Sequence, residues 1–308
     1  MIEKSSVPST QSSTFKNIVN ALDLYRGSDE KRHFLLDGLI PSGSLSMLYG
    51  TSDVGKSLLA RDLALHIVLG RNDYIGRKLK SDHNRVLYVS TEDDQNDIMS
   101  RIKRSICTYE HSSKLTGLDF MFPDGRDIIP EIDRYLTVNK TDLLVLDVVT
   151  DFNIGNINDA TDVRRFLNKF KIMAKKTGTT VLVLHHIGKG KEGINKDLAI
   201  GSQAWTAAPR SAMMLSKSAP CGEETRLLTL TKGNFASDGE KKRSIPLQLN
   251  NETLSFNPIV STSALEIFFH TTTKQKLSDN TEIVNMVLEL HGQTSHLRRL
   301  QKDWKKHP

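Results

Sequence analysis

The eight residues from Gly50 to Ser57 constrain the fold of this chain more than any other part of the sequence. They are Gly-Thr-Ser-Asp-Val-Gly-Lys-Ser, which has the spacing G-x-x-x-x-G-K-[ST]. A strand-length apolar run at residues 45–49 comes directly before them, and a helical pattern begins at Ser57. A strand, a turn with glycines and a helix in this order form a loop whose backbone N–H groups can surround a phosphate. We therefore expect a phosphate-binding loop between a buried strand and a helix.

The side chains of this loop predict the compound that it binds. Lys56 is suited to reach the β- and γ-phosphates of a nucleoside triphosphate and the Ser57 hydroxyl to ligate Mg²⁺, so we expect ATP and Mg²⁺ as ligands. Asp53 stands where glycine is frequent in such loops. Aspartate tolerates a left-handed backbone, but its charge is expected to weaken phosphate binding. The predicted nucleotide-binding residues are Gly50, Thr51, Ser52, Asp53, Val54, Gly55, Lys56, Ser57 and Leu58.

Three more strand-length runs rich in Val and Leu follow the loop, at residues 85–90, 143–149 and 180–185. Strands that are apolar on both faces belong in a parallel sheet covered by helices. The stretches between them supply such helices, because residues 57–69 and 160–176 have apolar positions at the 3.6-residue period of an amphipathic helix. The sequence therefore predicts an α/β fold with a mainly parallel sheet flanked by helices.

Two of these strands lead into acidic residues. Asp147 ends an apolar strand, which is a Walker B pattern, and is expected to hold Mg²⁺ through a water molecule, opposite Ser57. Hydrolysis of a nucleotide needs a carboxylate that orients and deprotonates water, and Val148 rather than glutamate follows Asp147. Glu92, which follows the neighbouring strand, is the expected substitute. The alternative is that Glu92 caps the helix predicted at residues 94–106.

Two adjacent histidines, His185 and His186, end another of the strands at the same edge of the sheet. His186 is expected to hydrogen-bond the γ-phosphate and to report hydrolysis to the loop that follows. A metal site shared by the pair is disfavoured, because adjacent residues of a strand point to opposite faces. The next loop, residues 188–196, is basic, and its chemistry fits a solvated linker and a nucleic-acid contact about equally.

Composition limits the remaining possibilities. Of the 308 residues, 38% are hydrophobic and 25% are charged, which is typical of a globular protein and excludes fibrous and wholly disordered classes. Lys and Arg number 42 against 36 Asp and Glu, and the net charge of +6 favours a polyanionic partner without establishing one.

Cys107 and Cys221 are expected to be reduced thiols, because two cysteines cannot form a disulfide framework. No segment approaches the ~18 apolar residues of a membrane span, so we expect a soluble, cytoplasmic protein without a membrane partner.

We expect one core with two appendages. Residues 1–32 have the composition of a flexible tail with a short helix, and residues 33–260 form the expected ATPase core. Residues 261–308 are expected to form a linker and a small, basic, helical C-terminal region, with helices at 280–290 and 295–306. The last helix is rich in Lys and Arg, which fits a contact with nucleic acid, although a solvated terminal helix is the favoured interpretation.

Together these motifs resemble the RecA-type ATPases of the RepA class, the hexameric replicative helicases of plasmids and phages, which are related to the DnaB and RecA cores. The resemblance rests on the phosphate loop, on Ser90-Thr-Glu-Asp93, on Asp147 without a following glutamate, and on Leu184-His-His-Ile-Gly-Lys-Gly190. Two later segments, residues 200–210 and 230–236, are also similar to segments of this family. The similarity covers residues 34–257.

The resemblance implies a RecA-like core that acts as an ATP-dependent DNA helicase in replication. Its ATP sites would lie between the subunits of a homo-hexameric ring on single-stranded DNA, with replication initiator or other replisome proteins as further partners. Glu92 is similar to the family's catalytic base and His186 to its sensor, while Arg210 and Lys232 match positions that reach the ATP of a neighbouring subunit. For Arg210 and Lys232 the alternative is a pair of surface cations. The predicted catalytic residues are Lys56, Glu92, Asp147, His186, Arg210 and Lys232.

The sequence also supports alternative functions. The DNA-gripping loops of such rings correspond to residues 152–159 and 188–196, and the first of these contains no Lys or Arg. This departure favours a second hypothesis, a RecA-like DNA-binding ATPase that acts in recombination or regulation without unwinding DNA. A small-molecule kinase is a third hypothesis, disfavoured because the sequence shows no Arg-rich lid of the kind that kinases place over the phosphates.

Overall fold

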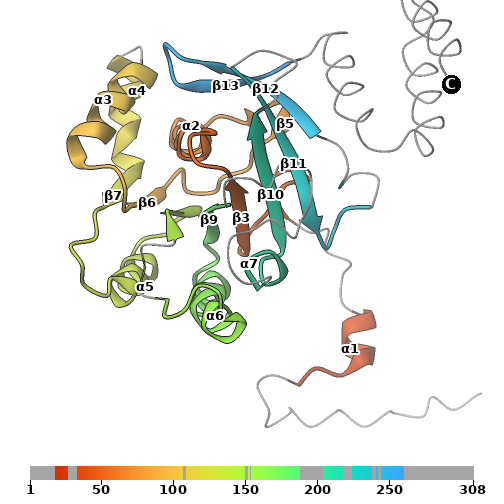
Figure 1. The fold of residues 1–308 in the computed structure, drawn as a ribbon. Coiled ribbons are helices and arrows are strands. Elements are labelled where there is room, and N and C mark those ends of the chain that lie inside the picture. Colours follow the sequence, from red (N-terminus) through yellow and green to blue (C-terminus); the bar gives the residue numbers. More distant parts are fainter. Residues whose placement is uncertain are drawn as a thin grey trace, which may run out of the picture. The chain divides into compact units, whose positions relative to one another are not determined.

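The computed structural model describes residues 18–26, 33–106, 109–149, 152, 154–187, 204–217, 224–237, 241 and 244–259 (Figure 1). The chain forms two units, Met1–His33 and Phe34–Pro308. The first contains helix α1 (Ala21–Arg26), none of whose residues is buried. The second contains all the other elements. The predicted basic loop 188–196, the predicted helices 280–290 and 295–306, and both cysteines lie outside the described residues.

A nine-stranded sheet with the order β13-β12-β11-β10-β3-β9-β8-β6-β7 forms the centre of the second unit (Figure 1). Its strands are β3 (Leu45–Gly50), β6 (Val86–Ser90), β7 (Leu118–Met121), β8 (Leu143–Asp147), β9 (Thr180–His186), β10 (Ser211–Lys217), β11 (Thr225–Gly233), β12 (Ser244–Asn250) and β13 (Ser255–Pro258). The six neighbouring strands β10, β3, β9, β8, β6 and β7, in this order across the sheet, pair in parallel. β11, β12 and β13 extend the sheet as antiparallel strands. The structure thus confirms the predicted α/β fold with a mainly parallel sheet.

Helices cover both faces of this sheet (Figure 1). They are α2 (Lys56–Val68), α3 (Gln95–Ser105), α4 (Tyr109–Lys114), the 3₁₀ helix η1 (Leu115–Gly117), α5 (Ile129–Val138), α6 (Ala160–Thr177) and α7 (Ala204–Ala207). Two small separate sheets pair β1 (Phe34–Leu36) with β2 (Ile40–Pro41) and β4 (Asp73–Tyr74) with β5 (Arg77–Lys78). Among the helices of the described residues, none has the length and apolar character that crossing a membrane requires.

Two apolar cores lie on opposite faces of the sheet. In β8, Leu143 and Val145 belong to the core that contains α2, whereas Leu144 and Leu146 belong to the core that contains α5 and α6. Alternate residues of a strand point to opposite faces, so one strand serves both cores. This arrangement explains why the sequence of the strand is continuously apolar instead of alternating.

Aspartate side chains cap the starts of α3 and α6, whereas no side chain caps the start of α2. Asp94 caps α3 and Asp159 caps α6, each by accepting hydrogen bonds from two backbone N–H groups of its helix. α6 ends at Gly178, which has a left-handed backbone. The residue before α2 is Gly55, which provides no side-chain cap. The first N–H groups of α2 therefore remain available to a ligand.

Candidate nucleotide-binding site

The carboxyl ends of four neighbouring strands meet at one edge of the sheet. β3, β9, β8 and β6 are adjacent and parallel, so the segments that follow them lie side by side. Lys56 follows β3, His186 ends β9, Asp147 ends β8 and Glu92 follows β6. The structure thereby brings together predicted catalytic residues that are distant in the sequence. Lys56 and His186, for example, are separated by 130 positions.

The phosphate loop turns sharply between β3 and α2. A Cβ atom at Gly50 would lie only 2.3 Å from the backbone oxygen of Leu215, so this position accepts only glycine. Asp53 has a left-handed backbone with a φ of 61°, a conformation that aspartate tolerates. Behind the loop, Nε of Arg226 donates a hydrogen bond of 2.8 Å to the backbone oxygen of Val54. No motif in the sequence indicates this contact, because Arg226 lies on strand β11, 172 positions from Val54.

Lys56 is buried, and neutral acceptors surround its ammonium group. Nζ donates hydrogen bonds to the backbone oxygens of Gly50 at 3.1 Å and Thr51 at 2.8 Å. Burial lowers the pKa of Lys56 from 10.5 to about 8, although the negative charges of Asp147 and Glu92 oppose this shift. Neutral oxygens solvate an ammonium group without neutralising it. An anionic phosphate is therefore a favourable additional partner for Lys56.

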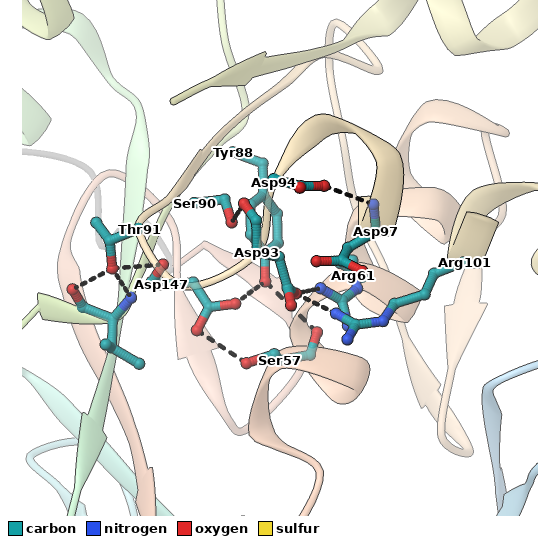
Figure 2. Close-up of polar contacts among 11 residues, drawn as sticks. Ser57, Arg61, Tyr88, Ser90, Thr91, Asp93, Asp94, Asp97, Arg101 and Asp147 are labelled. Carbon is teal, nitrogen blue, oxygen red and sulfur yellow. Dashed lines mark hydrogen bonds and ion pairs between the residues drawn. The ribbon is translucent and has the colours of Figure 1, made fainter. Parts of the chain in front are cut away.

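Ser57 and Asp147 are hydrogen-bonded to each other, with Oγ of Ser57 donating to Oδ1 of Asp147 at 2.9 Å (Figure 2). The hydroxyl of Tyr88, a residue of β6, donates to Oδ2 of Asp147 at 2.5 Å. Burial raises the pKa of Asp147, while the hydrogen bonds from Tyr88 and Ser57 lower it. Hydroxyl and carboxylate oxygens are ligands that Mg²⁺ prefers, so Ser57 and Asp147 fit a magnesium site. Within the described part of the chain, no group of three or more His, Cys, Asp or Glu could hold a metal ion.

His186 connects Glu92 with the phosphate loop. Nδ1 of His186 lies 3.1 Å from Nζ of Lys56 and 3.5 Å from Oγ of Ser52, and Nε2 lies 3.3 Å from Oε1 of Glu92. Because an ammonium group only donates, Nδ1 accepts from Lys56 and the Nε2 proton points to Glu92. The predicted sensor and the predicted base are therefore neighbours. The capping role considered for Glu92 is filled by Asp94.

A charge cluster fixes the segment between β6 and α3 (Figure 2). Oδ2 of Asp93 accepts hydrogen bonds from Arg61 of α2, at 2.7 Å, and from Arg101 of α3. Oγ of Ser90 donates to the backbone oxygen of Asp93 at 3.0 Å. Glu92 therefore stands on a backbone that is tied to two helices. The sequence pattern did not reveal this cluster, because Arg61 is 32 positions from Asp93 and no motif links them.

Arg210 and Lys232 lie at the opposite end of the sheet from Lys56. The backbone N–H of Arg210 donates to the oxygen of Leu45, the first residue of β3, whereas the phosphate loop follows the last residue of β3. Nζ of Lys232 donates to backbone oxygens at and just after the end of α7, one of them at 2.8 Å. A strand of this length spans about 17 Å. The structure therefore places neither cation in the site of its own chain.

Two cations of α6 accompany Arg210 and Lys232. Burial and the positive charges of Arg210 and Arg164 lower the pKa of Lys171. Burial and the positive charge of Lys171 likewise lower the pKa of Lys232. We call Arg164, Lys171, Arg210 and Lys232 the cationic edge. Like charges gathered on one surface favour an anionic partner.

The described residues of the loop 152–159, which was considered for DNA contact, are anchored to the protein. Phe152 packs against two phenylalanine rings of α6. Ile154 is buried, and Nε1 of Trp205 donates a hydrogen bond of 3.2 Å to the backbone oxygen of Ile157. These contacts belong to the apolar core on that face of the sheet.

A family model described as an AAA domain matches residues 10–192, which is more than half of the chain. No curated protein matches the sequence. The matched range contains the phosphate loop, Glu92, Asp147 and His186, and it ends before Arg210 and Lys232.

Proposed function

We propose that the chain, which belongs to the AAA domain family of P-loop ATPases, is an ATP-dependent DNA helicase or translocase of the RepA type. In this proposal it acts in DNA replication as a homo-hexameric ring on single-stranded DNA and meets replication initiator or other replisome proteins. The observation that carries the proposal is the set of Lys56, Ser57, Glu92, Asp147 and His186 at one edge of the sheet.

ATP and Mg²⁺ fit the residues of this site. Backbone N–H groups of the loop and of the uncapped start of α2 would hold the phosphates, and Lys56 would pair with the β- and γ-phosphates. Ser57 and Asp147 would hold Mg²⁺. When bound, the ion neutralises phosphate charge that develops during hydrolysis.

Glu92 is proposed as the base that orients and deprotonates water. Its Oε1 lies 3.3 Å from Nε2 of His186, whose Nδ1 contacts Lys56, and Asp93 fixes its backbone. Glu92 contacts the Nε2 side of His186, so a phosphate that draws His186 and Lys56 apart would also change the partner of Glu92.

The ring is supported by the position of the cationic edge. Arg210 and Lys232 are too far from the phosphate loop of their own chain to reach its nucleotide. They are proposed to reach the nucleotide of a neighbouring subunit, where a cation stabilises the negative charge of the transition state.

A second candidate is a RecA-like DNA-binding ATPase in recombination or regulation that does not unwind DNA. The observation that favours it is the loop 152–159, which packs into the core through Phe152 and Ile154 and has no Lys or Arg. A loop held in this way offers little to a DNA backbone.

The deciding experiment measures strand displacement on a forked DNA duplex, with ATP and with a non-hydrolysable ATP analogue, alongside the mass of the assembly by native mass spectrometry. The helicase proposal expects ATP-dependent displacement by a hexamer and none by Lys56→Ala, which should fold but lose ATPase activity. ATP hydrolysis without displacement would support the second candidate. No ATP hydrolysis by the unsubstituted protein would overturn both.

A further inference from the structure

We infer that Tyr88 is a positioning residue of the nucleotide site, whose hydroxyl fixes the carboxylate of Asp147 in the orientation that binds Mg²⁺. The inference rests on the proposed ATPase function and adds a residue to the same site. It begins from the hydrogen bond of 2.5 Å between the Tyr88 hydroxyl and Oδ2 of Asp147 (Figure 2).

The sheet explains why Tyr88 reaches Asp147. Tyr88 lies opposite Val145 in the parallel pair β6–β8, and Asp147 is two residues beyond Val145 on the same face. The Tyr88 ring belongs to the core that contains α2 and packs against Phe120, with ring centroids 5.4 Å apart. A long side chain anchored in this way directs its hydroxyl along the strand to the carboxylate at its end.

Both oxygens of the carboxylate then have a donor. Ser57 donates to Oδ1 from the phosphate loop, and Tyr88 donates to Oδ2 from within the sheet. The other acceptor near the Tyr88 hydroxyl, the backbone oxygen of Ser57, lies 3.4 Å away and is the weaker partner. Two donors on opposite oxygens prevent the carboxylate group from rotating about its own axis. Ser57 alone would restrain that rotation less.

Burial makes the contact important. Tyr88 is 0% exposed and Asp147 is 3% exposed, so water cannot replace the tyrosine hydroxyl readily. A buried carboxylate oxygen that loses its donor is costly, and the group relieves this cost by turning or by moving. Either change removes the carboxylate from the place where Ser57 and Asp147 would share one ion.

The chain offers a matched control in Tyr74. Its hydroxyl donates to the backbone oxygen of Leu59 at 3.0 Å, and Tyr74 is 2% exposed in the same apolar core. Tyr74→Phe and Tyr88→Phe therefore each remove one buried hydroxyl. The Tyr74 hydroxyl also interacts with the carboxylate of Asp62, outside the nucleotide site, so only Tyr88→Phe removes a donor from Asp147.

The test measures binding of a fluorescent ADP analogue to the full chain, without Mg²⁺ and across a Mg²⁺ titration, with thermal unfolding of each variant as a check of folding. For Tyr88→Phe we expect nucleotide affinity without Mg²⁺ to stay within about twofold, and the Mg²⁺ concentration for half-maximal enhancement to rise about tenfold or more. Tyr74→Phe should leave both values at those of the unsubstituted protein. Mn²⁺ bound with the nucleotide should give an altered paramagnetic resonance spectrum in Tyr88→Phe alone.

An unchanged Mg²⁺ requirement in folded Tyr88→Phe would overturn the inference, as would an equal change in both variants, because that would indicate a general structural effect. If the unsubstituted protein binds the ADP analogue with no response to Mg²⁺, the ATPase proposal fails first and the role of Tyr88 with it. The two failures are distinguished by the behaviour of the unsubstituted protein.

Discussion

The ammonium group of Lys56 is buried, and a bound nucleotide would change its protonation equilibrium. In the free protein burial lowers the pKa of Lys56 to about 8. Bound phosphates would favour the charged form and raise the pKa again. Nucleotide binding would then be accompanied by proton uptake wherever Lys56 is neutral in the free protein.

We predict that nucleotide affinity falls as the pH rises through about 8. Above that pH the free protein must gain a proton to bind, so the dissociation constant should rise by up to about tenfold per pH unit. The measurement is a titration with ADP or ATP from about pH 7 to about pH 9.5. Lys56→Arg is the control, because arginine keeps its charge over this range and should remove the dependence even if its affinity is lower.

The stability of the nucleotide-free protein should change in the opposite direction. Between about 8 and 10.5, the folded and reference pKa values of Lys56, the unfolded chain binds the proton and the folded chain does not. Stability therefore rises with pH over this window. A nucleotide affinity that does not change from pH 7 to 9.5 would show that Lys56 keeps its charge over this range and would contradict the lowered pKa.

The residues that the sequence predicted belong to local motifs, whereas the residues that it missed act through contacts between segments that are distant in the sequence. Lys56 and Ser57 belong to a contiguous motif, and Asp147 ends an apolar strand, so spacing alone identified them. Tyr88 resembles any aromatic residue of a buried strand, and its role appears only when β6 is placed beside β8. Arg226 was missed for the same reason, since its partner Val54 is 172 positions away.

Among the secondary-structure elements, strand β11 contacts both the phosphate loop and the segment that carries Arg210. Arg226, near its beginning, holds the backbone of the phosphate loop, and Lys232, near its end, holds the backbone that follows α7. Both bonds come from side chains of one strand that is hydrogen-bonded along its length to β10. The two bonds thus place the phosphate loop and the cationic edge in contact with opposite ends of β11, whose register with β10 shifts between Ala212 and Met213.

We predict that Arg226→Met weakens nucleotide binding about tenfold, because the loop loses the donor that holds Val54. Stability should change little, since an apolar side chain of similar length replaces a buried charge. Lys217→Met is the control, because Lys217 pairs with Arg226 in the register of β10 and β11 but is exposed. Equilibrium titration with a fluorescent ADP analogue and thermal unfolding measure the two effects. Equal affinities of the two variants would show that the contact with Val54 does not organise the loop.

Elements with strong periodicity were predicted well. The runs that became β3, β6, β8 and β9 and the patterns that became α2 and α6 agree with the structure to within a few residues. β7 was not predicted, because its four residues are all half-buried and include Asp119, so they lack a continuous apolar pattern. α5 was also missed, since Pro130 near its start resembles a loop signal in the sequence although proline suits a first helical turn.

The whole molecule presents two different charged surfaces at the two ends of its sheet. The nucleotide site lies where β3 ends, and Arg210 and Lys232 of the cationic edge lie where β3 begins. The sequence singled out Arg210 and Lys232 but not Arg164 or Lys171, and the separation of these cations from the nucleotide site depends on strand direction, which only the fold provides. Whether the two surfaces meet is a question about several copies of the chain.

We predict that Arg210→Ala lowers ATPase activity by about 10³-fold, the effect of a cation supplied by a neighbouring subunit. Mixed with Lys56→Ala, which cannot bind the triphosphate productively, it should regain activity. In an equal random mixture about a quarter of the neighbour pairs combine an intact loop with an intact Arg210, so activity should reach about a quarter of the unsubstituted level.

Arg165→Ala serves as the control for this experiment, because Arg165 is an exposed arginine of α6 that pairs with Asp162. It should keep full activity alone and in mixtures. Failure of the Arg210→Ala and Lys56→Ala mixture to recover at any ratio would indicate that Arg210 is a surface cation.

The separation of the nucleotide site from the cationic edge also determines how many complete sites an assembly of several chains contains. In the proposed head-to-tail assembly an open row always has one phosphate loop without a neighbour's cations, at one terminus, and one unused cationic edge at the other. Closing the row into a ring removes both defects at once. Turnover per chain would then depend on protein concentration, rising as rows lengthen and reaching its ceiling only at closure.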